Sequence, residues 1–200
     1  MLVVEEYRRE SGIPIIRTFI ALPVAGSPVE AVRAMIGDME EAGVSAKWVE
    51  PQNMHLTLKF LGDLPRTRIQ PLADAVSHAV QGEPRFEIAL RGAGAFPSPA
   101  RPRVLWVGIR EGADRLVRLS RSIDESTLSS GFASADKAFR PHLTIGRARG
   151  ESAGTRGADV ISRYSDAFWG TVSVDCIHVV ASALKPSGPV YTSLARIPLE

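Results

Sequence analysis

The sequence predicts a single domain of mixed helices and strands, built as two similar lobes that pack together. Three features support this prediction. Stretches with the apolar pattern of strands are interleaved with stretches of helical spacing along the 200 residues. The pattern His-Leu-Thr-apolar occurs twice, at 55–58 and 142–145, each time after a helical stretch. No low-complexity segment or long linker separates independent domains, so we expect residues 1–200 to form one bilobal domain.

The first half of the chain alternates between strand and helix. Residues 13–22, IPIIRTFIAL, are apolar and β-branched, and they predict a strand that Pro23 ends. Ser27-Pro28 then opens a helix, because serine is a favoured N-cap and proline suits the first turn, and Gly43 closes it. Further on, the spacing predicts strands at 46–50 and 55–62, a helix at 66–80, and strands at 86–96 and 103–109.

The second half repeats this order in part. The pattern predicts a helix at 112–130, a strand at 141–148, a glycine-rich joint at 150–157, a short helix at 159–164, and closing strands at 171–182 and 190–199. Residues 1–12 have the pattern of a frayed start. A helix, an H-L-T strand and a second helix thus occur twice, which suggests two related lobes.

The composition is that of an ordinary globular protein, 44% hydrophobic and 23% charged, with a formal net charge of +2. So small a basic excess does not indicate a large nonspecific nucleic-acid binder. Cys176 is the only cysteine, which excludes an intramolecular disulfide and a thiolate-rich zinc site and favours a reducing compartment. The first residues are too charged for a signal peptide, and no apolar run has membrane-spanning length. We therefore expect a soluble cytoplasmic protein.

The two H-L-T strands carry the strongest functional signal, because two of only four histidines occupy the same pattern. Alternate side chains of a strand share a face. His55, Thr57 and Lys59 should therefore point one way, and Phe60 should point into the core with the leucines. Two ordinary amphipathic strands with solvated polar faces are the alternative explanation.

In the second copy, His142 and Thr144 share a face in the same way. Arg140 joins that face if the chain stays extended through the intervening proline. Arg147 has the parity of the buried face, so it needs a bend at Gly146 to reach the polar one. Each strand should thus present an imidazole beside a hydroxyl.

Two histidines and two hydroxyls fit phosphoryl transfer. One imidazole can act as base and the other as acid near neutral pH, on opposite sides of a phosphorus atom that is attacked in line. Threonine hydroxyls can donate to the non-bridging oxygens, where charge accumulates. A zinc site would need a third ligand at close spacing, and the sequence shows none, so we expect neither metal nor cofactor.

Longer stretches around these motifs match a known family. RTFIALP (17–23), WVEPQNMHLTLKFLGDL (48–64), GAGAFPSPARPRVLWVGI (92–109) and FRPHLTIGRA (139–148) resemble the 2H phosphoesterases. Within them, the chain is most similar to the RNA 2',3'-cyclic phosphodiesterases, also called the 2'-5' RNA ligase family. The resemblance implies a bilobal α+β fold with an antiparallel sheet in each lobe and an active-site cleft between the lobes. It also implies hydrolysis of 2',3'-cyclic phosphate RNA ends without metal or nucleotide cofactor, and in some members 2'-5' ligation by the reverse reaction.

The resemblance assigns roles to the motif residues. It implies His55 as the acid that protonates the departing 3' oxygen and His142 as the base that activates water, which leaves a 2'-phosphate. The candidate phosphate ligands are Thr57, Thr144 and Arg140. Lys59 and Arg147 are candidate substrate contacts, with plain surface solvation as the alternative for all three cations.

The remaining histidines and tryptophans have structural explanations. We expect His78 on a helix surface, His178 as an ordinary sheet histidine, and Trp48 and Trp106 in the core. The expected partners are RNA ends or nucleotides that carry a 2',3'-cyclic phosphate, with no protein partner. Two alternatives stay open: a phosphodiesterase of small cyclic nucleotides or of an ADP-ribose cyclic phosphate, and a non-catalytic RNA-end binder.

Overall fold

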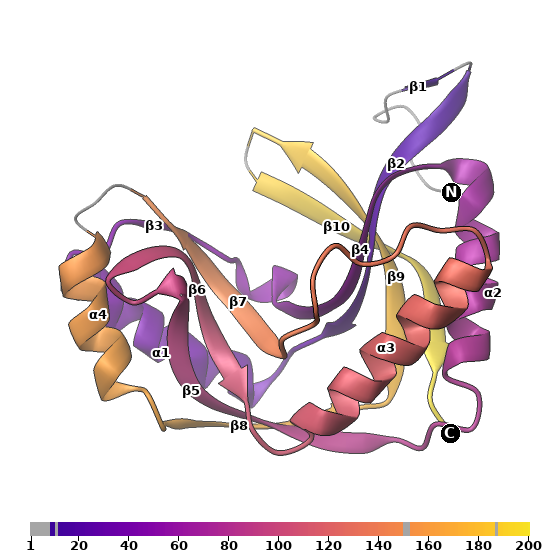
Figure 1. Ribbon diagram of the computed structural model, residues 1–200. Coiled ribbons are helices and arrows are strands. Elements are labelled where there is room, and N and C mark those ends of the chain that lie inside the picture. The colour runs from indigo at the N-terminus through magenta and orange to yellow at the C-terminus, as the bar shows by residue number, and fades with distance from the viewer. Residues whose placement is uncertain (1–8, 11, 150–152, 187) are drawn as a thin grey trace.

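The computed structural model of the protein describes residues 9–10, 12–149, 153–186 and 188–200 (Figure 1). Within these residues, two five-stranded antiparallel sheets and four α-helices form an α+β fold. This confirms the predicted fold class. The two sheets lie side by side in the view of Figure 1, each with helices against one of its faces.

The first sheet contains the strand of the first H-L-T motif. Its strands are β1 (Arg9–Glu10), β2 (Ile13–Pro23), β4 (His55–Pro65), β9 (Cys176–Lys185) and β10 (Gly188–Pro198). Strand β2 pairs with β1, β4 and β9, and β9 pairs with β10. The central strands β2 and β9 are rich in β-branched residues, which suit a pleated, buried surface.

The second sheet contains the second motif. Its order is β3 (Ala46–Trp48), β7 (His142–Ala148), β6 (Arg101–Ile109), β5 (Phe86–Ser98) and β8 (Phe168–Val174). The order β4-β2-β9-β10 of the first sheet therefore corresponds to β7-β6-β5-β8 of the second. In both, the motif strand pairs with a central strand along one side.

The helices cover the two sheets in pairs. They are α1 (Ser27–Glu41), α2 (Ile69–Ala79), α3 (Ala113–Ser129) and α4 (Ala153–Arg163), with short 3₁₀ turns at Pro51–Asn53 and Arg66–Arg68. Helices α2 and α3 pack on each other and on the first sheet, and α1 and α4 pack on the second (Figure 1). Helix α1 has proline in its first turn, as its sequence predicts, but Gly26 and not Ser27 is the N-cap residue.

The two lobes are interleaved along the chain, which the sequence pattern does not reveal. Strand β3 comes from the segment between β2 and β4 and yet belongs to the second sheet. The last two strands return to the first sheet. The predicted strand at 171–182 is in fact two strands, β8 and β9, which separate at Asp175 and enter different sheets. The lobes are therefore not the two halves of the sequence.

One continuous apolar core runs through both lobes. The leucines of the first motif, Leu56 and Leu58, and their counterparts Leu143 and Ile145 are all buried in it. Full burial of such a side chain is worth about 1.5–3 kcal/mol. The alternating apolar residues therefore fix which face of each motif strand meets the helices and which face stays open.

The ends of several elements differ from the prediction. Helix α4 begins at Ala153, earlier than expected for the segment at 159–164. Of the expected glycine-rich joint, residues 150–152 lie outside the described residues, as do residues 1–8 and 11 of the expected frayed start. No helix in the described part of the chain is long and apolar enough to cross a membrane.

Candidate active site

The two motif strands meet where the sheets adjoin. Strand β4 begins at His55 and β7 begins at His142, and the two strands contact each other across the junction. The structure therefore places two motif strands that are far apart in the sequence against each other. Both imidazoles are partly buried.

The two histidines are held by the same local contact. The Nδ1 of His55 lies 2.6 Å from the carbonyl oxygen of Asn53, and the Nδ1 of His142 lies 2.6 Å from the carbonyl oxygen of Arg140. Because a carbonyl can only accept, each Nδ1 carries the proton and donates it. Each Nε2 is therefore available to exchange a proton with a ligand. The carbonyl oxygen of the residue two positions earlier fixes the orientation of each ring.

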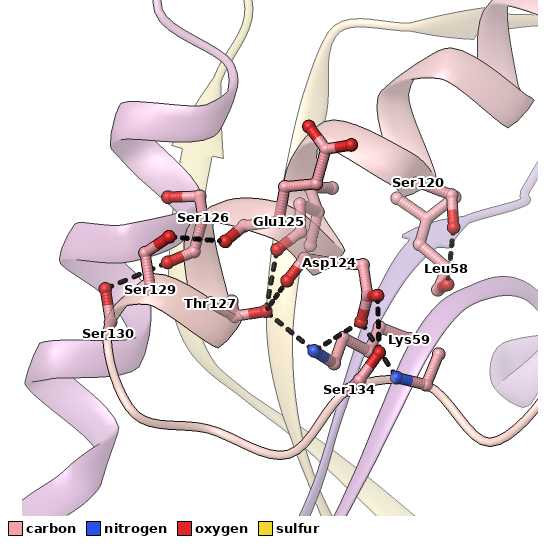
Figure 2. Close-up of polar contacts among 12 residues, drawn as sticks. Leu58, Lys59, Ser120, Asp124, Glu125, Ser126, Thr127, Ser129, Ser130 and Ser134 are labelled. Atoms are coloured by element: carbon pink, nitrogen blue, oxygen red, sulfur yellow. Dashed lines mark hydrogen bonds and ion pairs between the residues drawn. The ribbon is translucent and has the colours of Figure 1, made fainter.

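A β-bulge interrupts the first motif strand immediately after its threonine. Thr57 pairs with Ala21 on β2, but the next pair joins Lys59 to Ile20, so that Leu58 is an extra residue. A bulge of this kind places two consecutive residues opposite one and shifts the side-chain alternation by one residue, until a second bulge at Leu61 shifts it again. The hydroxyl of Ser120 on α3 donates to the carbonyl oxygen of Leu58 at 2.9 Å, which satisfies a backbone group at the bulge (Figure 2).

The bulge overturns two predictions from strand parity. Lys59 does not share the face of His55 and Thr57: its side chain is 1% exposed and points toward α3. Phe60, expected in the core, is instead 50% exposed and lies under the guanidinium of Arg17, 4.6 Å from its ring centre. Lys59 is therefore not available to substrate.

The buried ammonium of Lys59 is neutralised by α3 (Figure 2). It lies 2.6 Å from a carboxylate oxygen of Asp124 and donates to Thr127 Oγ1 at 2.7 Å. Asp124 also accepts from Ser134 Oγ and from the backbone N–H of Ala135, both at 2.9 Å. Partial burial acts to raise the pKa of Asp124, but these hydrogen bonds outweigh it and hold the pKa below its ordinary value.

The second motif has the same bulge at the same position. Thr144 pairs with Trp106 on β6, and Gly146 pairs with Leu105, so Ile145 is the extra residue. Arg147 consequently returns to the face of Thr144 and is exposed there. The bend that Arg147 was expected to need is thus present, one residue before Gly146.

Aromatic rings surround His55. Its ring lies 4.9 Å from that of Phe19 and 5.1 Å from that of Tyr191, and the latter two are 5.2 Å apart. Burial lowers the pKa of His55 from its usual value near 6.5, and the hydrogen bond to Asn53 offsets this in part. The neutral imidazole is therefore favoured in the free protein.

Residues of both sheets meet around Tyr191. Burial raises the pKa of its hydroxyl, while the positive charges of Arg147 and Arg17 act in the opposite direction. Arg147 belongs to the second sheet and Tyr191 to the first, so a cation of the second motif lies near the aromatic group that contacts His55. This arrangement favours an anionic ligand between the two motifs.

The threonine hydroxyls are available to such a ligand. Among the described residues, neither Thr57 nor Thr144 has a side-chain hydrogen-bond partner, and both side chains are partly exposed. Arg140 contacts His142 through its carbonyl oxygen, while its side chain is exposed. The described residues hold no cluster of three or more histidine, cysteine, aspartate or glutamate side chains arranged to bind a metal ion.

A pocket of about 140 Å³ opens beside His55 in the first sheet. It is lined by Phe19, Ala21, Pro23, Gln52, Asn53, Met54, His55, His178, Val180, Tyr191 and Ser193. His178 is a sheet histidine, as expected: it lies on β9, and its ring nitrogens are within hydrogen-bond distance of Ser193 and Cys176, while its side chain also lines this pocket. Burial, the dominant cause, and Arg196 lower its pKa, and Asp175 offsets part of the shift.

The remaining residues of interest divide between surface and core. His78 is exposed on α2, which confirms its prediction. Trp48 packs against the core, also as expected. Trp106 does not, because it pairs with Thr144 and thus lies on the open face of the second sheet, 5.2 Å from the ring of Phe96. Phe96 in turn lies 5.1 Å from the ring of His142.

Sequence reasoning missed the aromatic neighbours of the histidines. Phe19, Tyr191 and Phe96 each lie on a strand other than the motif strands, so only the pairing register brings them to the imidazoles. A local pattern can indicate a strand, but it does not show which residues of a neighbouring strand each face meets.

A pair of histidines, each with a threonine two residues later, on corresponding strands of two related sheets defines a two-histidine phosphoesterase. Residues 22–106 match the LigT-like phosphoesterase family. With this match and the relatives described next, the chain belongs to the LigT-like phosphoesterases, the 2H phosphoesterase family.

Similar proteins span nearly the whole chain. An Archaeoglobus fulgidus protein named RNA 2',3'-cyclic phosphodiesterase is 37% identical over 89% of this chain and 97% of its own length. One of the same name from Methanothermobacter thermautotrophicus is 32% identical over 90% and 96%. A Thermus thermophilus crystal structure has a TM-score of 0.72 at 27% identity, covering 92% of this chain and 98% of that one. Escherichia coli LigT, 24% identical with the same coverage, has a TM-score of 0.73 and supports the fold.

Proposed function

We propose that this protein is a phosphoric diester hydrolase that opens 2',3'-cyclic phosphates at RNA ends. The observation that carries the proposal is the matched pair His55 and His142, each held by Nδ1 on a carbonyl 2.6 Å away and each followed by a threonine on the same face. The relatives named RNA 2',3'-cyclic phosphodiesterase support this substrate class. E. coli LigT has been crystallised with 3'-AMP, which is consistent with a nucleotide site in this fold.

The reaction follows from one base and one acid on either side of phosphorus. His142 takes a proton from water as the water oxygen forms its bond to phosphorus. His55 gives a proton to the 3' oxygen as the bond between phosphorus and that oxygen breaks. The product carries a 2'-phosphate and a free 3'-hydroxyl. In-line geometry requires these two groups on opposite sides of phosphorus, and the contact between the two motif strands supports this assignment.

The other motif residues bind the phosphate. The hydroxyls of Thr57 and Thr144 donate to the non-bridging oxygens, which gain charge in the transition state. Arg140 and Arg147 contribute positive charge near the anion. No metal ion or cofactor takes part in this scheme, because the imidazoles supply both proton transfers. Attack by a ribose hydroxyl in the reverse reaction would join two RNA ends through a 2'-5' bond.

The lowered pKa of His55 bears on its role as acid. In the free protein, burial favours the neutral ring, which could not protonate the leaving oxygen. A bound phosphate brings a negative charge next to the imidazole, and an opposite charge within a few ångströms raises a histidine pKa. Substrate binding would therefore favour the protonated His55 imidazolium, which is the form that can act as the acid.

The test is hydrolysis of a labelled oligonucleotide ending in a 2',3'-cyclic phosphate, in excess EDTA, with the products resolved by chromatography. We expect the 2'-phosphate. A 3'-phosphate product would reverse the assignment of the leaving oxygen. Loss of activity in EDTA that one divalent ion restores would contradict the metal-free scheme. Small cyclic nucleotides and an ADP-ribose cyclic phosphate, assayed in parallel, distinguish the alternative substrates, and no turnover on any of them would indicate a binding protein.

A further inference from the structure

Helix α3 holds the first motif strand at its bulge, immediately after Thr57. The hydroxyl of Ser120 donates to the carbonyl oxygen of Leu58. A carboxylate oxygen of Asp124 lies 2.6 Å from the ammonium of Lys59 (Figure 2). Ser120 and Asp124 stand at i and i+4, so they share the face of α3 that contacts β4. The two residues that follow Thr57 are thus both bound to α3.

The second motif has the same bulge with a glycine in place of the lysine. The carbonyl oxygen of its bulged residue, Ile145, accepts from the backbone N–H of Val49 at 2.9 Å. The counterpart of Lys59 is Gly146, and a Cβ added there would lie 2.7 Å from the indole of Trp48. The bulge itself therefore does not require a buried lysine. Because an ion pair taken out of water costs desolvation energy, its presence in one of the two copies indicates a separate role.

Asp124 has a second set of partners, in the loop that leads to the other motif. Residues 130–141 join α3 to β7 without helix or strand. In the middle of this loop, the hydroxyl of Ser134 and the backbone N–H of Ala135 donate to the two oxygens of the carboxylate, each at 2.9 Å. Residues 136–138, which follow, are exposed. The carboxylate therefore anchors the middle of a largely exposed loop to the helix.

The loop ends at the carbonyl that orients His142. This carbonyl belongs to Arg140, and its oxygen lies 2.6 Å from Nδ1 of the ring. His55 has a different support, because Asn53 belongs to a 3₁₀ turn and its side chain donates to the carbonyl oxygen of Pro189 at 3.1 Å. The carbonyl that orients His55 is thus set by local structure, whereas the one that orients His142 depends on where the loop lies.

We propose that Asp124 is a positioning residue of the catalytic site. Bound to Lys59 beside the first motif, it fixes the loop at 130–141. It thereby fixes the Arg140 carbonyl that orients His142. This inference rests on the proposed function, in which the Nε2 of His142 takes a proton from water. Nε2 can accept only in the tautomer whose proton is on Nδ1, and the carbonyl selects that tautomer. A ring without this carbonyl can adopt either tautomer, so fewer molecules are competent for catalysis.

The experiment compares Asp124→Asn and Ser134→Ala with the native protein by two measurements. The first is heteronuclear NMR of the histidine ring nitrogens at about pH 8, where a neutral imidazole reports which nitrogen carries the proton. The second is kcat on a dinucleotide that ends in a 2',3'-cyclic phosphate. In the native protein we expect the Nδ1–H tautomer for both His55 and His142. In the two variants, His142 should become a mixture of tautomers while His55 keeps its proton on Nδ1.

The two variants differ in how much of the anchor they remove. We expect kcat to fall about tenfold or more in Asp124→Asn. It should fall about two- to tenfold in Ser134→Ala, which removes one loop hydrogen bond and leaves the ion pair with Lys59 in place. Ser134 is exposed, so its variant should fold and carries the test if Asp124→Asn does not. The control is Leu116→Ala, a core substitution on the same helix, which should lower the urea midpoint but leave kcat and both tautomers unchanged in the folded protein.

Several results would overturn the proposal. They are an Nε2–H tautomer of His142 in the native protein, an unchanged tautomer in both variants, and native kcat in both variants. An equal shift in the tautomer of His55, or an equal loss of kcat in Leu116→Ala, would also overturn it, because either would show a general loosening of the fold. If even the native protein turns over no cyclic phosphate, the proposed function is removed, and the tautomers alone decide whether Asp124 orients His142.

Discussion

The ammonium of Lys59 lies 2.6 Å from a carboxylate oxygen of Asp124, in a setting where the lysine side chain is 1% exposed and the aspartate 26%. The pair joins the first motif strand to α3. Through Asp124 it also joins the loop at Ser134 and Ala135, which leads to the second motif. It is a buried pair whose members both have further hydrogen bonds, so removing one partner leaves a charge or a donor without compensation.

We predict that Lys59→Met destabilises the protein by about 2–4 kcal/mol, slightly less than the usual loss for a broken buried pair because Asp124 keeps some contact with water. Urea denaturation measures this change. Asp124→Asn should also destabilise, and the double variant should lose clearly less than the two single losses combined. Simple additivity would show that the two side chains are not coupled.

The matched control is the exposed ion pair of Arg121 with Glu125 on the same helix, which has a similar distance of 2.8 Å. Both of its side chains are largely exposed, and exposed pairs contribute little to stability. Arg121→Ala should therefore leave the urea midpoint unchanged within error. A loss as large as that of Lys59→Met would mean that burial does not decide the strength of these pairs.

Our second prediction concerns the two histidines of the motifs. His55→Ala and His142→Ala should each lower kcat on a 2',3'-cyclic phosphate by about 10²–10⁴-fold, the usual contribution of a general acid or base. Because both act in one transition state, the double variant should lose less than the product of the single losses. His78→Ala, at an exposed helix position, is the control and should be fully active. Near-normal kcat in either motif variant would contradict the two-histidine mechanism.

The motif strands show how far sequence reasoning reaches. Strand parity placed His55 and Thr57 correctly, because it applies over the first three residues of the motif. It failed at Lys59 and Phe60, since the bulge at Leu58 reverses the facing of both side chains. A bulge depends on pairing with the neighbouring strand and on a partner such as Ser120 for the freed carbonyl, and neither can be read from a local pattern.

The arrangement of the lobes was only partly predictable for a similar reason. Periodicity located most strands and helices, because burial of one face is a local property. It did not show that β3 crosses to the second sheet or that the chain changes sheets at Asp175. The pocket beside His55 is likewise lined by residues of β2, β4, β9 and β10, which only the pairing registers of these strands bring together.

A third prediction concerns Gly94, on which the indole of Trp106 rests. A methyl group there would come within 2.3 Å of the ring, so Gly94→Ala must displace the indole. We expect a loss of about 1–3 kcal/mol in the free energy of unfolding, typical of overpacking. Activity should fall as well, because Trp106 contacts Phe96, which contacts His142.

The comparison variant is Gly37→Ala, in the middle of α1, where an added Cβ meets nothing within 4 Å. Alanine is favoured over glycine inside a helix by about 0.5–1 kcal/mol, so this variant should be slightly stabilised and fully active. Thermal and urea unfolding of both variants provide the measurement. Equal stability of Gly94→Ala and the native protein would mean that the indole does not occupy this position.

The last prediction concerns the titration of His55. Burial lowers its pKa in the folded protein, so NMR titration of the free protein should give a value below 6.5. Because the unfolded chain binds a proton more readily than the folded protein, the contribution of His55 to folding stability is complete above pH 6.5. It is lost as the pH falls through the pKa of the folded protein. A bound phosphate or 2'-nucleotide should raise the pKa again, because its negative charge favours the imidazolium.

If His55 is the acid, kcat/KM must decrease as the pH rises through its free-protein pKa, which places this value on the alkaline limb of the profile. If the pKa of His55 by NMR instead coincides with the acidic limb, His55 is the base, and the two histidines exchange the roles proposed for them.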